Sequence, residues 1–127
     1  MSYYFNKAVN LTFDQAVTRV TEELKKEGFG VLTEIDVKET LKKKIDADVR
    51  PYKILGACNP TFAYQALQAE DKIGIMLPCN VIVQETPEGI EVSAVDPIVS
   101  MAAVDNPNLG DVAKQVQTKL KKVIENL

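Results

Sequence analysis

The sequence predicts an α+β protein in which helices pack against a mostly antiparallel or mixed sheet of about five strands. Its 127 residues match the length of one ordinary domain, and no linker divides residues 1–127, so we expect a single domain. Apolar residues alternate in some short segments and recur at helical spacing in others, in the order β-α-β-α-β-α-β-β-α. This order combines a hairpin with helical crossovers, which is typical of a mostly antiparallel or mixed sheet.

The first part of the chain is predicted to form two strands, each followed by a helix. Residues 3–9 are β-prone, residues 12–15 have the Thr-x-x-Gln spacing of a capping box, and Gly28 can end the first helix in a left-handed conformation. A second strand over residues 29–35 reaches Asp36, which is suited to cap a second, highly charged helix. The apolar faces consist of Phe13, Ala16, Val17, Val20 and Leu24 in the first helix and of Val37, Leu41 and Ile45 in the second.

The middle of the chain is predicted to form a third strand over residues 52–57 and a third helix that ends at about residue 70. Asn59 is suited to the N-cap position and Pro60 to the first helical position, where its missing N–H is not needed. The buried side of this helix is expected to consist of Phe62, Ala63, Ala66 and Leu67.

The last part of the chain is predicted to contain a hairpin and a long helix. Residues 73–84 are expected to be extended, and a turn at residues 86–89 joins them to a strand over residues 90–95. Asp96 and Pro97 end that strand, and an apolar connection leads to the final helix. The inward-facing residues are expected to be Leu77, Cys79, Val81 and Val83 in the strand, and Leu109, Val112, Ala113, Val116, Leu120, Val123, Ile124 and Leu127 in the helix.

The composition excludes several classes of function. The chain has no His, so it lacks the commonest general base, the commonest metal ligand and both Ser-His and Cys-His nucleophile pairs. A net charge of −3 argues against a nucleic-acid partner, and the three lysines at residues 42–44 are typical of a solvated helix face. No run of roughly 18 apolar residues could span a membrane, and residues 1–7 do not resemble a secretory signal. We therefore expect a cytoplasmic protein with reduced thiols.

The two cysteines are the most informative candidates for chemistry. Cys58 and Cys79 are each followed by Asn, and Cys58 precedes a helix start, where a helix dipole would favour a thiolate. The third helix returns the chain by roughly 16 Å, and an extended segment over residues 71–79 returns it by more than roughly 25 Å. Cys79 can therefore come level with Cys58, and Met101 offers a third soft sulfur atom or simply a core side chain.

Other polar residues have both a structural and a functional interpretation. Glu34 and Asp36 share one side of an extended segment and form either a general acid/base pair or a salt bridge and a helix cap. Asn80 lies opposite the presumed core face of its strand, as an exposed edge residue or as an amide that faces a ligand. Asp96 is a strand terminator or a carboxylate at a strand end, where sites are commonly built.

Several motifs, taken together in order, resemble one known family. They are residues 30–36, residues 54–60, residues 77–83 and residues 95–97 with Met101. The chain resembles the family catalogued as domain of unknown function 302 over nearly its whole length. The resemblance implies a small α+β bacterial or archaeal domain, found alone or fused to others, that tends to dimerise and has no established activity. It directs attention to Glu34, Asp36, Cys58, Asn59, Cys79, Asn80, Asp96 and Met101.

Three functions agree with these observations. The first is a dimeric binding module whose ligand, a small sulfur-containing molecule or a soft metal ion, lies between Cys58, Asn59, Cys79 and Asn80, with Glu34, Asp36 and Asp96 as neighbours. The second is a thiol redox or sulfur-transfer enzyme in which Cys58 attacks and Cys79 resolves through a disulfide. The third is a structural or protein-interaction domain with inert thiols. A homodimer is expected because it would cover the exposed edge of the sheet.

Overall fold

The computed structural model describes residues 2–127 and confirms the predicted α+β fold and order of elements. Five strands form one sheet in the order β1-β5-β4-β3-β2, and every neighbouring pair is antiparallel. The elements are β1 (Tyr4–Val9), α1 (Phe13–Lys26), β2 (Gly30–Asp36), α2 (Val37–Ile45), β3 (Tyr52–Cys58), α3 (Pro60–Ala69), the 3₁₀ turn η1 (Ile73–Met76), β4 (Cys79–Thr86), β5 (Gly89–Val95), α4 (Pro97–Ser100), the 3₁₀ turn η2 (Pro107–Leu109) and α5 (Gly110–Glu125).

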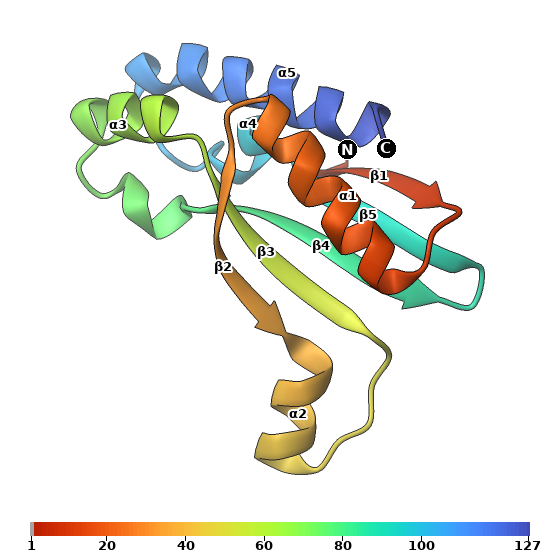
Figure 1. The fold of residues 1–127 in the computed structure, drawn as a ribbon. Coiled ribbons are helices and arrows are strands. Elements are labelled where there is room, and N and C mark those ends of the chain that lie inside the picture. The colour runs from red at the N-terminus through yellow and green to blue at the C-terminus, as the bar shows by residue number, and fades with distance from the viewer. Residues whose placement is uncertain (1) are drawn as a thin grey trace.

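Helices α1 and α5 pack on one face of the sheet, and the main core lies between them and the strands (Figure 1). Leu55, Val81 and Ala94 lie side by side on β3, β4 and β5 and are fully buried, because alternate residues of a strand face the same side. The opposite side of the sheet carries the exposed residues Tyr4 and Asn80, and we call it the open face.

Strands β2 and β3 extend beyond the helices and carry α2 at their end (Figure 1). We call residues 32–53 the arm, and residues 37–50 the arm tip. No residue of α2 is buried, so its apolar face has no core of its own chain to pack against. Leu32, at a bulge in β2, and Ile45, at the end of α2, are each 69% exposed. The arm therefore presents large apolar side chains to solvent.

The predicted caps at both ends of α1 are confirmed. The Gln15 N–H donates to Thr12 Oγ1 (3.2 Å), and the Thr12 N–H donates to Gln15 Oε1 (3.0 Å), which completes the capping box. Gly28 adopts φ +87° after the helix, a conformation that costs glycine least. The Asp36 cap of α2 is also confirmed, because its Oδ1 accepts from the Glu39 N–H (3.0 Å).

Two sequence predictions of local structure are wrong. Residues 73–78 are not part of a strand, because the chain turns at η1 and places Ile73 in a second buried cluster with Ala66 and Leu109. Leu67, expected on the buried side of α3, is 44% exposed, since α3 buries only Ala66 completely. No helix among residues 2–127 has the length and apolar character needed to cross a membrane.

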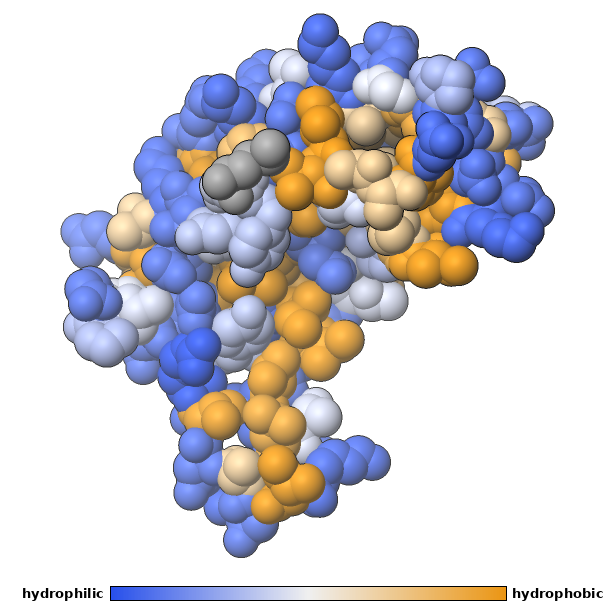
Figure 2. All heavy atoms as spheres, turned by 180° about the vertical axis from the view of Figure 1, so that it is seen from behind, coloured by the Kyte–Doolittle hydropathy of each residue, from blue (hydrophilic) through white to orange (hydrophobic). Residues whose placement is uncertain are grey.

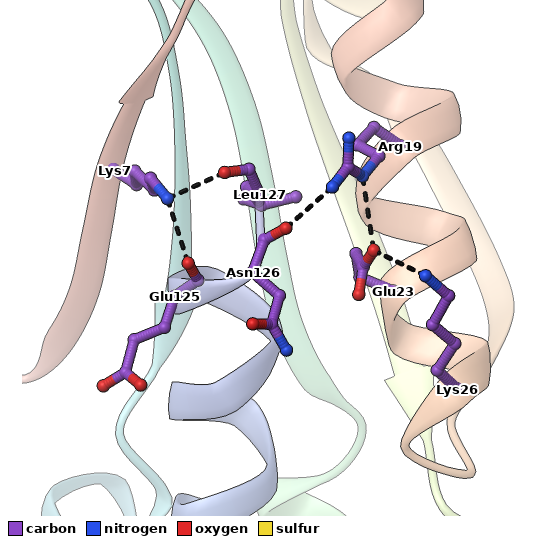
Figure 3. Close-up of polar contacts among 7 residues, drawn as sticks. All are labelled: Lys7, Arg19, Glu23, Lys26, Glu125, Asn126 and Leu127. Atoms are coloured by element: carbon purple, nitrogen blue, oxygen red, sulfur yellow. Dashed lines mark hydrogen bonds and ion pairs between the residues drawn. The ribbon is translucent and has the colours of Figure 1, made fainter.

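The C-terminal end of α5 is held by cations from two other elements (Figure 3). Lys7 Nζ donates to the carbonyl oxygens of Glu125 (3.0 Å) and Leu127 (2.7 Å), and Arg19 Nη2 donates to that of Asn126 (2.8 Å). The last carbonyls of a helix lack partners within the helix and carry partial negative charge, so positively charged donors stabilise them. These contacts join β1 and α1 to the end of α5.

Glu23 is the buried anion of this region. Its Oε1 lies 2.9 Å from Lys26 Nζ and 3.3 Å from Arg19 Nε, and its side chain is only 5% exposed. The hydrogen bond from Lys26 lowers the pKa of Glu23 against the opposing effect of burial, and Arg19 lowers it further. Because the unfolded chain lacks these partners, the folded state favours the charged carboxylate.

We expect Glu23→Gln to reduce the free energy of unfolding by about 1 kcal/mol at neutral pH. A carboxylate whose pKa is lower in the folded state stabilises fully above its ordinary value of 4.5, and this stabilisation is lost as pH falls through the folded pKa. Urea unfolding between pH 3 and pH 7 should therefore show the difference between wild type and variant shrinking at low pH. Glu22→Gln, at an exposed site of α1, is the matched control. A difference that stays constant with pH would contradict this assignment.

Gly56 allows the central strands to approach their neighbours on the open face. A Cβ atom at this position would lie 2.8 Å from Pro78 Cγ and would also overlap Thr33 Oγ1. We expect Gly56→Ala to reduce the free energy of unfolding by roughly 1–3 kcal/mol, because the proline ring must move. Gly30→Ala, in β2, is the control, since a Cβ there meets nothing within 4 Å. Equal stability of the two variants in urea unfolding would show that the site is not crowded.

Candidate functional site

Both cysteines line one small cavity beneath α3, at the end of β3 and the start of β4. The cavity has a volume of about 30 Å³. Met101, at the end of α4, and Asn59 also line it, and the rest of its wall is apolar, with Phe29 and Phe62 among the lining side chains. The structure therefore brings sulfur-containing side chains from three places in the chain to the lining of one cavity.

The strand pairing brings the two cysteines to the same end of the sheet. Cys79 pairs with Ala57 across β3 and β4, and Cys58 is the next residue at the end of β3. The prediction that Cys79 comes level with Cys58 is thus confirmed, although the chain returns through η1 and not as one extended segment. Neither cysteine is in a disulfide; Cys58 is half-buried and Cys79 is buried.

Burial determines the protonation of the inner thiol. Desolvation, together with charge repulsion from the nearby Cys58, raises the pKa of Cys79 to about 11. At neutral pH only about one Cys79 thiol in ten thousand is ionised. Because the thiolate is the reactive form, Cys79 is a poor nucleophile in the unliganded protein.

Asn59 has a structural task that the sequence did not indicate. It occupies the N-cap position of α3, but its side chain makes no capping hydrogen bond. Its Nδ2 donates instead to the carbonyl oxygen of Glu27 (3.3 Å), and a Cβ atom on Gly28 would lie 2.9 Å from it. Asn59 therefore connects the start of α3 to the end of α1, where the chain leaves the first helix.

Asn80 lies on the other side of the sheet from the thiols. It pairs with Gly56 on the open face, where it is exposed and lines a shallow hollow of about 500 Å³. The side chains of Tyr4, Tyr52 and Glu91 line the same hollow. Asn80 is thus not a neighbour of the cysteine cavity, because successive residues of a strand point to opposite faces.

Polar contacts cross the hollow on the open face. Gln84 Nε2 donates to Glu91 Oε1 (2.7 Å), and Arg50 Nε donates to Gln84 Oε1 (2.8 Å). The Arg50 guanidinium carbon lies 5.3 Å from the centre of the Tyr52 ring, in the range of cation–π contacts. Sequence reasoning missed this surface, although the polar residues that alternate with buried ones along β4 mark it.

Glu34 and Asp36 lie on the arm, at the far end of the strands. Glu34 Oε1 forms an ion pair with Lys53 Nζ (2.8 Å), a contact that raises the pKa of Lys53, and Asp36 caps α2. Gly30 pairs with Cys58 at one end of β2 and Asp36 pairs with Lys53 at the other, so about 20 Å of strand separates Asp36 from the thiols. The carboxylates and the cysteines do not form one site.

Asp96 is buried, and both of its carboxylate oxygens accept hydrogen bonds from its own chain. Gln117 Nε2 donates to both carboxylate oxygens at 3.1 Å, and the Ile98 N–H donates to Oδ1 at 3.0 Å. These bonds cap α4 and attach it to α5, which is a structural role. Within residues 2–127 no three His, Cys, Asp or Glu side chains come together as a metal site. The cavity lined by Cys58, Cys79 and Met101 contains no carboxylate side chain among its lining residues.

Comparisons with known proteins agree with the fold. The model of the family described as "Domain of unknown function DUF302" matches residues 5–127. A solved structure, described as the crystal structure of uncharacterized conserved protein DUF302 from Bacillus stearothermophilus, is similar with a TM-score of 0.92 and 26% identity over 98% of each chain. No curated protein matches the chain. The family resemblance is confirmed, and the chain belongs to the DUF302 family.

Proposed function

We propose that this protein is a binding module for one soft metal ion, such as Cu(I), held by the sulfur atoms of Cys58, Cys79 and Met101. The observation that carries the proposal is the convergence of these three side chains on one cavity. Thiolate and thioether ligands are soft and select Cu(I) over the hard cations that carboxylates and waters bind. The absence of His from the chain leaves sulfur as its only soft ligand.

The size of the cavity favours an ion over an organic ligand. About 30 Å³ is only two to three times the roughly 10–15 Å³ of free space that a cavity needs to hold one water molecule. A small sulfur-containing molecule would need more room between the wall side chains, Phe62 among them, than a single ion coordinated by sulfur atoms. The apolar wall would also exclude water from the bound ion.

The protonation of Cys79 argues against the thiol redox alternative. A resolving thiol must attack as the thiolate, and burial keeps Cys79 protonated at neutral pH. Metal binding differs, because the bound ion compensates the cost of the buried negative charge and displaces the proton. The same burial also agrees with a domain whose thiols are inert. A measurement of metal binding distinguishes the metal-binding function from the inert-thiol one.

An anaerobic titration of Cu(I) against a chromophoric chelator tests the proposal. We expect one ion per chain, and a loss of affinity of roughly 10-fold or more for Cys58→Ser and for Cys79→Ser, because each removes a ligand. Met101→Leu should cause a smaller loss, and Met76→Leu, at a site outside the cavity, should cause none. Circular dichroism checks that each variant is folded. Wild-type affinity in the Cys58→Ser/Cys79→Ser protein, or no binding by the wild type, would leave the thiols as inert core residues.

The pH dependence of Cu(I) affinity provides an independent test. Because the pKa of Cys79 is about 11, its thiol must release a proton when it binds the ion at any pH between 6 and 8. The logarithm of the Cu(I) affinity should therefore rise with pH. Cys79→Ser should reduce the slope of this plot by about one decade of affinity per pH unit, because one fewer proton is released. A slope that is the same in wild type and Cys79→Ser would mean that Cys79 is not a ligand.

A further inference from the structure

We propose that the hollow on the open face binds a linear organic polycation, such as a polyamine, with an ammonium group at each end of the hollow. The hollow has a volume of about 500 Å³, and its lining combines aromatic rings, carboxamides and one carboxylate. Figure 2 shows the open face, where apolar side chains run along the middle and down toward the arm. These groups suit a ligand that combines positive charge with apolar length.

The charge on the lining favours a cation. Among residues 2–127, Glu91 is the one charged residue that lines the hollow. Its Oε1 accepts a hydrogen bond from the neutral Gln84 amide (2.7 Å), and no Lys or Arg of those residues forms an ion pair with it. An anionic ligand would meet a like charge here, whereas an ammonium group would meet an opposite one.

Tyr3 and Tyr4 form an aromatic corner at one end of the hollow. Their ring centroids are 5.0 Å apart, and the ring planes are inclined by 75° to each other. Tyr3 is 65% exposed and Tyr4 is 44% exposed, so a ligand can reach both rings. The face of an aromatic ring carries partial negative charge and attracts a cation, so two rings at a large angle provide a place for an ammonium group.

A carboxylate and a third ring lie at the other end of the hollow. Tyr4 pairs with Val95 of β5, four residues after Glu91, so about 13 Å of strand separates the two ends. Gln84 pairs with Glu91 on one side and with Tyr52 on the other, which places the carboxylate and the third ring in one row across the sheet. The hollow therefore has two separate groups of side chains that attract cations.

An apolar side chain lies between the two ends. Ile82 pairs with Ser93, which is midway between Glu91 and Val95 on β5, and both Ile82 and Ser93 line the hollow. Ammonium groups at the two ends need a chain of carbon atoms between them, and the Ile82 side chain can contact that chain. A compact cation would reach only one end. A linear polyamine, in which methylene segments join charged amines, has the required form.

Arg50 shows that the Tyr52 end accepts an organic cation. Its guanidinium carbon lies 5.3 Å from the centre of the Tyr52 ring, and its Nε donates to Gln84 Oε1 (2.8 Å). Arg50 is exposed and is the last residue of the arm tip. An ammonium group of the ligand has the same charge and would compete with Arg50 for this ring. Arg50 therefore weakens the binding of a polyamine, and its removal should strengthen it.

Isothermal titration calorimetry with spermidine at low ionic strength tests the proposal. We expect one spermidine per chain, and affinity reduced by roughly 3-fold or more in Glu91→Gln and in Tyr4→Leu, because each removes a group that attracts an ammonium ion. Glu88→Gln is the matched control for charge and Tyr64→Leu for the ring, since both sites are exposed and outside the hollow. Circular dichroism checks each fold. No binding by the wild type, or equal losses in Glu91→Gln and Glu88→Gln, would overturn the proposal.

Ligand length tests whether both ends take part. Octylamine has one ammonium group and diaminopropane is too short to span the hollow, so each should bind roughly 3-fold or more weakly than spermidine. Arg50→Gln should strengthen spermidine binding by roughly 2-fold or more, whereas Lys38→Gln, at another exposed site of the arm tip, should have less effect. Equal affinity for octylamine and spermidine, or unchanged affinity in Arg50→Gln, would overturn a ligand that spans the hollow.

Spermidine binding is independent of the cysteine cavity, which lies on the other side of the sheet. Cys58→Ser/Cys79→Ser should therefore bind spermidine with wild-type affinity, and Glu91→Gln should bind Cu(I) with wild-type affinity. The failure of one proposal is thus distinguishable from the failure of the other.

Discussion

The pairing register between β3 and β4 determines what both faces of the sheet can do. Because side chains alternate along a strand, a slip of one residue would exchange the buried and exposed sets. The observed register places Cys79 opposite Ala57, on the core side, and Asn80 opposite Gly56, on the open face. The glycine is what permits this arrangement, because Thr33 and the Pro78 ring occupy the space of a side chain. The cysteine cavity and the hollow therefore belong to adjacent residues of the same strand.

The two candidate surfaces have different physical characters. The cysteine cavity is small and apolar, and it keeps Cys79 protonated, so chemistry there requires a partner that can displace a proton. The open face is broad and combines apolar and polar side chains, with hydrogen bonds from Arg50 to Gln84 and from Gln84 to Glu91. A binding event in the cavity involves single atoms, whereas one on the open face involves a whole surface. The cysteine cavity and the open face therefore lie on opposite sides of the sheet.

Local patterns predicted most of the fold. Helical periodicity and the capping box predicted α1 with correct ends, and alternation predicted the buried face of β4, because these signals lie within a few residues. The turn at Ile73 was missed because its cause is a contact with Leu109, far away in the sequence. Periodicity located the apolar stripe of α2 but could not say that no core of its own chain would cover it. The separation of Glu34 from the thiols likewise depended on strand pairing, which the sequence did not specify.

The edge position of β1 has a consequence for the order in which the chain can fold. Its pairing partner in the sheet is β5, which begins at residue 89, and Lys7 contacts residues 118 and 120 positions further along the chain. Contacts of such long range form late, because the intervening chain must first be brought together. On a ribosome, β1 emerges before the other four strands of this sheet, and it must wait for β5 and α5. The earliest of the five strands is therefore among the last to be paired.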